Sequence, residues 1–297
     1  MRILVTGGAG FVGSNVVDAL VKRGDLVTAL DDLSTGDRQN LESSGASLVI
    51  ADVSDRDVTF GALRDHRFDA VVHLASKTKV GQSVEQPELY RRVIVDGTAT
   101  ILEAARASGA RRFVNVSSGG VIYGETTTCA HEGMPIAPVS PYGKYKAEAE
   151  ALVSGSGLSA LTLRPANIYG PRQRKDLEGG VVAQFHGCWL DGSPVSVRGG
   201  GTMERDYLYV GDVCDAVIAA LRSERQGVYN IGTGVATSVA RLVALMTDML
   251  GPPPEVRQVP ALPGELRRNC LDVGKAARDG LWHPRTSLAD GLRLTLA

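Results

Sequence analysis

Thr6-Gly7-Gly8-Ala9-Gly10-Phe11-Val12-Gly13 is the stretch of this 297-residue sequence that decides its fold. It follows a short apolar run, Ile3-Leu4-Val5, and opens a helical pattern that extends to about Lys22. Its glycines fit both the G-x-G-x-x-G and the G-x-x-G-x-x-G spacing. Because glycines let a backbone approach a pyrophosphate, and a helix N-terminus offers it unpaired N–H groups, the stretch predicts a strand, a phosphate-binding turn and a helix.

An acid after the second apolar run, 26–30, extends this prediction to a dinucleotide. Asp31 follows Gly13 by 18 residues and ends the run. Its carboxylate would accept hydrogen bonds from an adenosine ribose and repel a 2′-phosphate, which favours NAD over NADP. Asp52-Val53, after the third run, is a candidate contact for the adenine. The alternative, a glycine turn that serves only helix–strand packing, fits the combination of strand, helix and acid less well.

Apolar runs and helical patterns alternate through the first half of the chain. The runs lie at 3–5, 26–30, 47–50, 70–74, 112–117 and 158–164, and the helical patterns at 10–22, 94–107 and 141–153. This alternation predicts an α/β fold with a doubly wound parallel sheet. After about residue 165 glycine and proline become frequent. We therefore expect a dinucleotide-binding domain over 1–165, to which 205–233 returns, and a smaller C-terminal substrate-binding domain over 166–204 and 234–297.

The composition of the chain limits the kinds of molecule that it can bind and the place where it is expected to act. The formal net charge is -1, so no basic surplus is present to hold nucleic acid or an anionic membrane. No run reaches the roughly 18 apolar residues of a membrane span, and the N-terminus shows no signal peptide, so we expect a cytoplasmic protein. Cys129, Cys188, Cys214 and Cys270 are far apart and form no C-x-x-C pair. We expect them to be reduced, with neither a metal site nor a disulfide framework.

Candidate catalytic residues lie at 117–118 and 142–146. Tyr142 and Lys146 are four residues apart on a predicted helix, so both emerge on one face. Ser117 and Ser118 end the fifth run, and ligands of parallel sheets bind at the carboxyl ends of strands, so we expect all of them at one cleft. A tyrosine of pKa about 10 becomes a base near neutral pH when two cations lower its pKa by roughly three units, about 4 kcal/mol. Ser118 would polarise the same substrate hydroxyl. A solvated helix face is the alternative for the tyrosine–lysine spacing.

With these motifs the chain resembles the extended short-chain dehydrogenase/reductases, within them the NAD-dependent nucleotide-sugar epimerase/dehydratase family, and most closely its UDP-glucose 4-epimerase-like members. The resemblance runs nearly end to end and is more specific for the family than for the substrate. It is carried by the glycine turn, Asp31-Asp32-Leu33-Ser34-Thr35-Gly36, His73-Leu74-Ala75, Ser117-Ser118-Gly119-Gly120, Tyr123-Gly124, Ser140-Pro141-Tyr142-Gly143 with Lys146, 163–173, Arg205-Asp206-Tyr207 and Tyr229-Asn230-Ile231-Gly232.

The resemblance implies a Rossmann domain, NAD as cofactor and a UDP-hexose as substrate. Tyr142 would be the acid/base, Lys146 would orient the nicotinamide ribose, and Ser118 would bind the sugar 4-OH. The 4-OH proton would pass to Tyr142 and the C4 hydride to NAD, and the 4-keto sugar would turn over before the hydride returns. Implied cofactor contacts are Gly7, Gly10, Phe11, Val12, Gly13, Asp31, Asp32, Ser34, Thr35, Gly36, Asp52, Val53, Leu74, Ala75, Ser76, Tyr142 and Lys146. Implied substrate contacts are Ser118, Tyr142, Asn167, Val181, Val197, Arg205 and Arg174, and no metal is implied. Family members commonly form homodimers, here through the helices near 88–107 and 141–154.

Departures from the family pattern keep alternatives open. Arg174-Lys175 stands where related epimerases often carry an acid and a proline; a cation there could meet a UDP-uronate, or be a solvated loop charge. Leu262-Pro263-Gly264-Glu265 replaces a common Arg-Pro-Gly-Glu, so one diphosphate arginine is missing unless Arg267 or Arg268 compensates. Ile94 replaces an asparagine, and Lys77 and Lys79 flank the usual lysine position.

Four other functions are weighed against the epimerase. A 4,6-dehydratase needs an Asp-Glu pair after the strand-end hydroxyl, where this chain has Gly119-Gly120, and similar decarboxylases keep a Glu in that stretch. A 4-ketoreductase that consumes NADH or NADPH stays open because Tyr142 and Lys146 would serve it equally. The presence of both residues argues against a non-catalytic NAD- or nucleotide-sensing protein.

Overall fold

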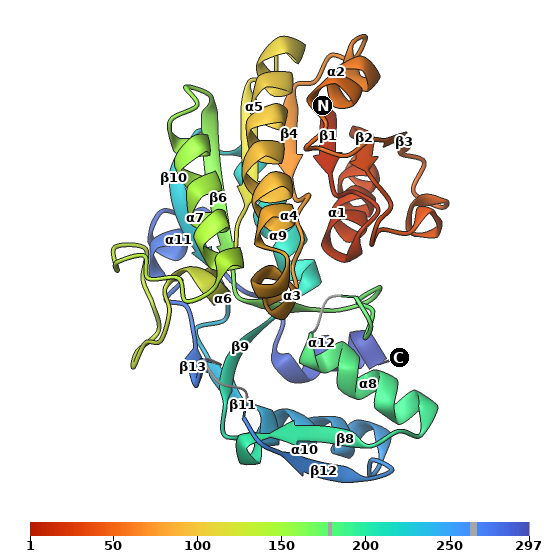
Figure 1. The fold of residues 1–297 in the computed structure, drawn as a ribbon, viewed down its shortest axis with the longest axis vertical. Helices are drawn as coiled ribbons and strands as arrows, with labels where there is room; N and C mark the ends of the chain where they lie inside the picture. Colours follow the sequence, from red (N-terminus) through yellow and green to blue (C-terminus); the bar gives the residue numbers. More distant parts are fainter. Residues whose placement is uncertain (178–179, 262–265, 297) are drawn as a thin grey trace.

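A seven-stranded sheet forms the centre of the computed structural model, which describes residues 1–177, 180–261 and 266–296 (Figure 1). The strand order is β10-β6-β5-β4-β1-β2-β3, and every neighbouring pair is parallel. The strands are β1 (Arg2–Thr6), β2 (Leu26–Asp31), β3 (Ser47–Ile50), β4 (Ala70–His73), β5 (Arg112–Val116), β6 (Ser159–Pro165) and β10 (Gly227–Ile231). Because the chain winds outward from β1 in both directions, the predicted doubly wound α/β fold is confirmed.

Helices cover both faces of this sheet, and the alternation of side chains along each strand fills two cores. Ile3 and Val5 of β1 point into the core under α1 (Phe11–Lys22), α9 (Val210–Arg222) and α11 (Gly274–Arg278). Leu4 points the other way, into the core under α2 (Arg56–Leu63), α5 (Gly97–Ser108) and α7 (Pro141–Ser154). Shorter segments are η1 (Arg38–Leu41), α3 (Val80–Glu85), α4 (Pro87–Arg91), the π-helical η2 (Arg92–Asp96) and α6 (Gly119–Ile122).

A second region lies beyond the carboxyl edge of the large sheet (Figure 1). In it β9 (Glu204–Tyr209) pairs with β7 (Asn167–Tyr169), β11 (Ala236–Ser238) and β13 (Arg268–Asn269), and β8 (Val195–Arg198) pairs with β12 (Val256–Val259). The remaining elements are α8 (Val181–Asp191), η3 (Gly199–Gly201), α10 (Val239–Leu250) and α12 (Leu288–Leu296). A separate apolar core joins β7, β8, β9, α8, α10 and α12 of this region.

The segment 205–233 divides between the two regions. Its first strand, β9, belongs to the second region, whereas α9 and β10 pack on and extend the large sheet. The domain limits drawn from the sequence stay a prediction.

The expectation of four reduced cysteines is wrong for one pair. Cys129 and Cys270 form a disulfide with a Cα–Cα distance of 4.5 Å, although 141 residues separate them. They meet because the loop before α7 runs beside β13, with a backbone bridge between Ala130 and Leu271. Cys188 and Cys214 carry free thiols. Within the described residues, no helix is both long enough and apolar enough to cross a membrane.

Candidate active site

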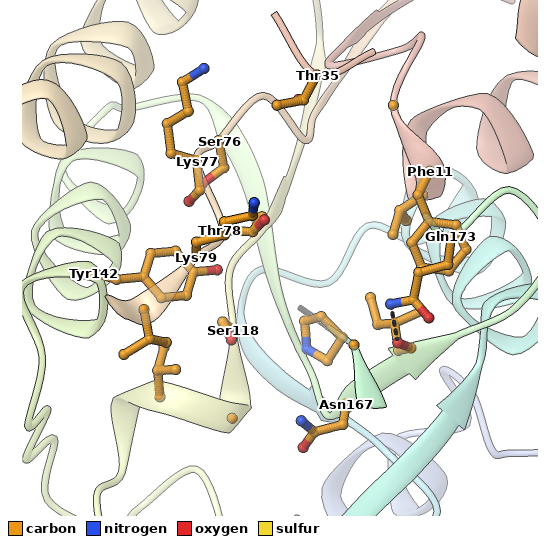
Figure 2. Close-up of a pocket in the computed structure, with 18 of the residues that line it drawn as sticks. Phe11, Thr35, Ser76, Lys77, Thr78, Lys79, Ser118, Tyr142, Asn167 and Gln173 are labelled. Atoms are coloured by element: carbon orange, nitrogen blue, oxygen red, sulfur yellow. Dashed lines mark hydrogen bonds between the residues drawn. The ribbon is translucent and has the colours of Figure 1, made fainter. Parts of the chain in front are cut away.

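A cavity of about 1020 Å³ lies between the large sheet and the second region (Figure 2). Residues at the carboxyl ends of β1, β2, β4, β5 and β6 line one side of it, and residues of α8, β8 and β9 line the other. Such a position, outside the carboxyl edge of a parallel sheet, is where ligands bind in doubly wound folds. One continuous cavity therefore joins the predicted cofactor site and the predicted substrate site.

The glycine turn shapes the cofactor end of the cavity. A methyl group added at Gly13 would lie 1.9 Å from the Gly7 oxygen, so α1 packs on the turn only without a side chain there. Gly7 has φ +68°, a left-handed conformation that favours glycine. Gly7, Gly10, Phe11, Val12 and Gly13 all line the cavity. Helix α1 begins at Phe11 without a side-chain cap, so the N–H groups of its first turn suit a pyrophosphate.

Asp31 ends β2 and lines the cavity together with the glycine turn. Its carboxylate accepts hydrogen bonds from the Ala9 and Leu33 backbone N–H groups, each at 2.9 Å, and burial raises its pKa. Gly36 was predicted to contact the cofactor, but it does not line the cavity. It packs against Asp31, since a methyl group at Gly36 would lie 2.7 Å from the Asp31 Oδ1 atom. The absence of a side chain at Gly36 therefore leaves room for the Asp31 carboxylate.

The other predicted cofactor residues line the cavity, and one lysine joins them. Asp32 accepts hydrogen bonds from the Ser34 hydroxyl and N–H, and the Lys77 ammonium donates to the Ser34 hydroxyl at 2.8 Å. The lining residues of this part are Asp31, Asp32, Ser34, Thr35, Asp52, Val53, Leu74, Ala75, Ser76 and Lys77. The open glycine turn, the acid and the apolar walls together fit NAD.

The three predicted catalytic side chains meet inside the cavity. Helix α7 begins at Pro141, and its N-cap Ser140 accepts a hydrogen bond from the Gly143 N–H at 3.1 Å. This start places Tyr142 and Lys146 on the inner face, both buried. Ser118, two residues after the end of β5, lies near Tyr142, and its side chain opposes the rise in the pKa of Tyr142. Figure 2 shows both side chains facing the cavity, with Phe11 and Gln173 on the opposite wall.

Burial controls the charge of the catalytic pair. Lys146 donates to the Val116 carbonyl at 3.2 Å, and its nitrogen lies 6.0 Å from the centre of the Tyr142 ring. Burial raises the pKa of Tyr142 to about 12, against an opposing effect of the Ser118 side chain. Burial also lowers the pKa of Lys146 to about 8, while the charge of Glu150 opposes that shift. Two cations, those of Lys146 and the nicotinamide, are expected from the sequence to lower the pKa of Tyr142. Without the cofactor, Lys146 does not bring this pKa below its usual value.

A buried ion pair fixes α7 against the sheet. The Glu150 carboxylate, one turn after Lys146, lies 2.6 Å from an Arg164 nitrogen, and both side chains are almost fully buried. Arg164 also donates to the Tyr123 hydroxyl at 2.7 Å, and Tyr123 donates to the Asn230 side-chain oxygen at 2.8 Å. This network joins β6, β10 and α7, so the orientation of the catalytic helix is set by charges outside the cavity.

His73 is part of the framework and not a base. Its ring nitrogens form hydrogen bonds with the Thr6 hydroxyl at 2.7 Å and the Thr98 hydroxyl at 3.0 Å. Complete burial, followed by the nearby Lys146 charge, lowers the pKa of His73 to about 3. His73 is therefore neutral at physiological pH and connects β1, β4 and α5.

The substrate end holds some of the predicted residues but not all. Asn167, Val181 and Arg205 line the cavity. Val197 faces the apolar core instead, because side chains alternate along β8 and its neighbours Ser196 and Arg198 face the cavity. Arg174 lies outside the lining, on an exposed loop, where it pairs with Asp176 at 2.8 Å.

Arg267 and Arg268, the two candidates to replace the missing family arginine, both lie away from the cavity lining in the described part of the chain. Arg268 pairs with Glu204 at 2.9 Å and Arg267 is exposed, and neither of the two lines the cavity. Residues 262–265, where the sequence departs from the family pattern, lie outside the described residues.

Asn269 is a polar residue that the sequence analysis missed. It is buried on the two-residue strand β13, beside Arg205 in register, and its amide donates to the Gly120 carbonyl at 3.1 Å. Its side-chain oxygen has no hydrogen-bond partner within the described part of the chain. A methyl group at Gly120 would lie 3.7 Å from the Ser118 hydroxyl, 3.8 Å from the Asn167 oxygen and 3.9 Å from this oxygen. Ser118, Gly120 and Asn167 line the cavity, whereas Asn269 lies behind Gly120 and does not line it.

Comparison with known proteins agrees with this geometry. The model of the NAD dependent epimerase/dehydratase family matches residues 3–232. The chain belongs to this family. A "UDP-glucose 4-epimerase" of Mycolicibacterium smegmatis is 40% identical over 306 residues, covering 100% of this chain and 97% of the relative. NAD is thus the cofactor of this chain.

Solved structures of the same family have nearly the same fold. A UDP-glucose 4-epimerase of Thermotoga maritima with UDP-glucose has a TM-score of 0.95 and 38% identity, covering 100% of this chain and 97% of that one. A UDP-glucose 4-epimerase of Thermus thermophilus in complex with NAD has a TM-score of 0.93 and 39% identity, covering 100% and 98%. The enzyme class of this chain is that of the NAD-dependent epimerases.

Proposed function

We propose that this chain interconverts UDP-glucose and UDP-galactose by inverting C4 of the sugar. The observation that carries the proposal is that Ser118, Tyr142 and Lys146 line the same cavity as the glycine turn, with the Lys146 ammonium 6.0 Å from the centre of the Tyr142 ring. The relatives named UDP-glucose 4-epimerase in the comparisons support the choice of substrate.

In the proposed mechanism Tyr142 is the acid/base. When bound, NAD supplies a carbon that accepts the C4 hydride and gives it back. Ser118 holds the sugar O4 beside the Tyr142 hydroxyl, and Tyr142 takes the O4 proton as the 4-keto sugar forms. Lys146, held by the Val116 carbonyl, keeps a positive charge near the phenolate. After the sugar has turned, Tyr142 returns the proton to O4 and the opposite 4-epimer leaves.

Gly119 and Gly120 favour an epimerase over a dehydratase. A methyl group at Gly119 would lie 2.5 Å from a Leu271 methyl carbon, so an aspartate does not fit there without repacking. Gly120 faces the sugar space and brings no acid to C5 or C6. The position of Arg174 outside the cavity lining also removes the observation that favoured a UDP-uronate.

A homodimer through α4, η2, α5 and α7 is a further part of the proposal. These helices pack against one another on one side of the large sheet, and they carry exposed residues such as Arg92, Glu103 and Leu152. Size-exclusion chromatography with light scattering tests it: a dimer mass is expected, and a monomer mass at micromolar concentration contradicts it. A cytoplasmic location stays a prediction.

The direct assay of the function uses no added reductant. Purified protein loaded with NAD is incubated with UDP-glucose, and UDP-galactose is expected, whereas Tyr142→Phe should lose roughly 10²–10⁴-fold of the rate while it keeps its NAD. Product that forms only with stoichiometric NADH or NADPH would instead indicate a ketoreductase. Near-normal turnover of Tyr142→Phe would remove Tyr142 from its role.

A further inference from the structure

Two lysines of one short segment reach across the mouth of the cavity. Lys77 and Lys79 both line the cavity, in the segment that connects β4 to α3. The Lys77 ammonium donates to the Ser34 hydroxyl at 2.8 Å, and the Lys79 ammonium donates to the Asp176 carbonyl at 2.6 Å. Both hydrogen bonds are exposed, which places them at the opening of the cavity and not at its floor.

The Lys77 bond passes over the end of β1. In the large sheet β1 lies between β4 and β2. Lys77 comes shortly after the end of β4, and Ser34 comes shortly after the end of β2. The bond between them therefore spans the carboxyl end of β1, from which the glycine turn leaves. It closes the cavity above the N–H groups that suit the pyrophosphate of NAD.

The Lys79 bond joins two opposite walls of the cavity. Lys79 directly precedes α3, and α3 packs against the catalytic helix α7. Figure 2 shows Lys79 beside Tyr142, whereas Gln173 lies on the opposite wall. Asp176 belongs to the same loop as Gln173, the loop 170–177 between β7 and α8. The Lys79 bond therefore crosses the opening in front of Tyr142.

Other contacts fix the loop 170–177 to the helix that follows the glycine turn. The Pro171 carbonyl accepts a hydrogen bond from the Asn15 side chain at 3.2 Å, and Arg172 pairs with Asp18 at 2.7 Å. Asn15 and Asp18 both lie on α1. The Lys79 bond thus ends on a part of the chain that is held in place independently, so its loss would open the mouth without releasing the loop.

We propose that Lys77 and Lys79 form a clasp that holds NAD in the cavity, so that the cofactor leaves only after both bonds have opened. A dinucleotide that extends from the glycine turn to Tyr142 lies beneath both bonds. The benefit of the clasp rests on the proposed function: an epimerase regenerates its NAD in every turnover and does not need to release it, whereas a ketoreductase must exchange its cofactor each time.

The rate of NAD release tests the clasp. Protein loaded with radiolabelled NAD is mixed with an excess of unlabelled NAD, and the label that stays bound is followed by filter binding. Methionine keeps much of the length of lysine but cannot donate a hydrogen bond. Lys77→Met and Lys79→Met should each raise the rate constant of release roughly three- to tenfold, and the double variant should raise it further. Lys22→Met, at the exposed end of α1, is the matched control and should release NAD like the wild type.

The rate constant of association, obtained from the release rate and the Kd of NAD, separates a clasp from simple attraction between the lysines and the phosphates. Loss of a clasp leaves association as fast as in the wild type or faster, whereas loss of attraction slows it. Ser34→Ala removes the partner of Lys77 without a change of charge, so it should also speed release. In that background Lys77→Met should add little, and a full further increase would contradict the Lys77–Ser34 bond as the cause.

Unchanged release from the double variant would overturn the inference. Slower association as the only change would overturn it too, and so would an equally fast release from Lys22→Met. Because the measured quantity is the release of NAD, faster release without any epimerisation of UDP-glucose would support the clasp and contradict the proposed function. Epimerisation by a protein whose NAD release is insensitive to both lysines would do the reverse.

Discussion

The Lys146 ammonium lies 6.0 Å from the centre of the Tyr142 ring, yet Tyr142 has a pKa of about 12. Burial of both groups explains the combination, because it disfavours the phenolate and the ammonium alike. Without the cofactor, Tyr142 is thus held in its neutral acid form, while Lys146 still carries its charge at neutral pH. A second cation, that of the oxidised nicotinamide, is needed to make Tyr142 a base.

Tyr142 should therefore ionise at a lower pH when NAD is bound. A cation within about 4–6 Å lowers the pKa of an acid by roughly 1–3 units. The difference in phenolate absorbance between wild type and Tyr142→Phe should show no ionisation of Tyr142 below about pH 10 without NAD, and clear ionisation there with NAD. Identical titrations in the two forms would contradict this assignment of the second cation.

Arg205 should bind the diphosphate of the substrate, and Arg174 should not. Arg205 lines the cavity, while Arg174 pairs with Asp176 on the surface. Loss of a charge-assisted hydrogen bond in Arg205→Gln should raise the KM for UDP-glucose roughly ten- to a hundredfold. The matched variant Arg174→Gln should leave KM nearly unchanged. The inhibition constant of UDP should follow the same order, and equal effects of the two variants would speak against it.

Two adjacent glycines should respond very differently to a methyl group. In Gly119→Ala the new carbon would meet a Leu271 methyl at 2.5 Å, whereas in Gly120→Ala its nearest neighbour is the Ser118 hydroxyl at 3.7 Å. We expect Gly119→Ala to lose about 1–3 kcal/mol of unfolding free energy through overpacking, and Gly120→Ala to stay within about 0.5 kcal/mol of the wild type. Urea denaturation measures both. Equal stability of the two variants would contradict the prediction, because it would show that the Leu271 side chain moves aside at little cost in free energy.

His73 should make the folded protein sensitive to acid. Its pKa is about 3 in the fold and 6.5 in the unfolded chain, so between these values the unfolded state binds one proton more. Stability must then fall as pH falls below the unfolded pKa, by about 2 kcal/mol between pH 7 and pH 5 from this group alone. Denaturation of wild type and His73→Gln at both pH values isolates the contribution. A variant that loses as much stability on acidification as the wild type would disprove it.

The large sheet could be predicted because its signals are local. Each strand is a short apolar run, and Pro141 after Ser140 marks the start of the catalytic helix in the sequence itself. The glycine turn could also be predicted from its own residues, because both the close packing of α1 and the approach of a pyrophosphate require glycine at positions such as Gly7 and Gly13. The meeting of Tyr142, Lys146 and Ser118 could be predicted, because parallel strands place their carboxyl ends at one edge of the sheet.

The substrate side could not be read from the sequence in the same way. Asn269 and Cys270 come to lie behind Gly120 through the pairing of β13 with β9 and with the loop around Ala130, and no local pattern specifies either pairing. Val197 was placed in the site although the alternation along β8 turns it to the core. The rise in the pKa of Tyr142 without NAD could not be read from the sequence, because its burial depends on the whole cavity wall.

The fate of the hydrogen on C4 tests the central claim most directly. UDP-glucose deuterated at C4 is incubated with the NAD-loaded protein in ordinary water, and the UDP-galactose is analysed by mass spectrometry and NMR. Because Tyr142 moves only the O4 proton and the hydride returns to the same carbon, the product should keep its deuterium at C4. Replacement of that deuterium by solvent hydrogen, or product that appears only with added NADH, would contradict the account.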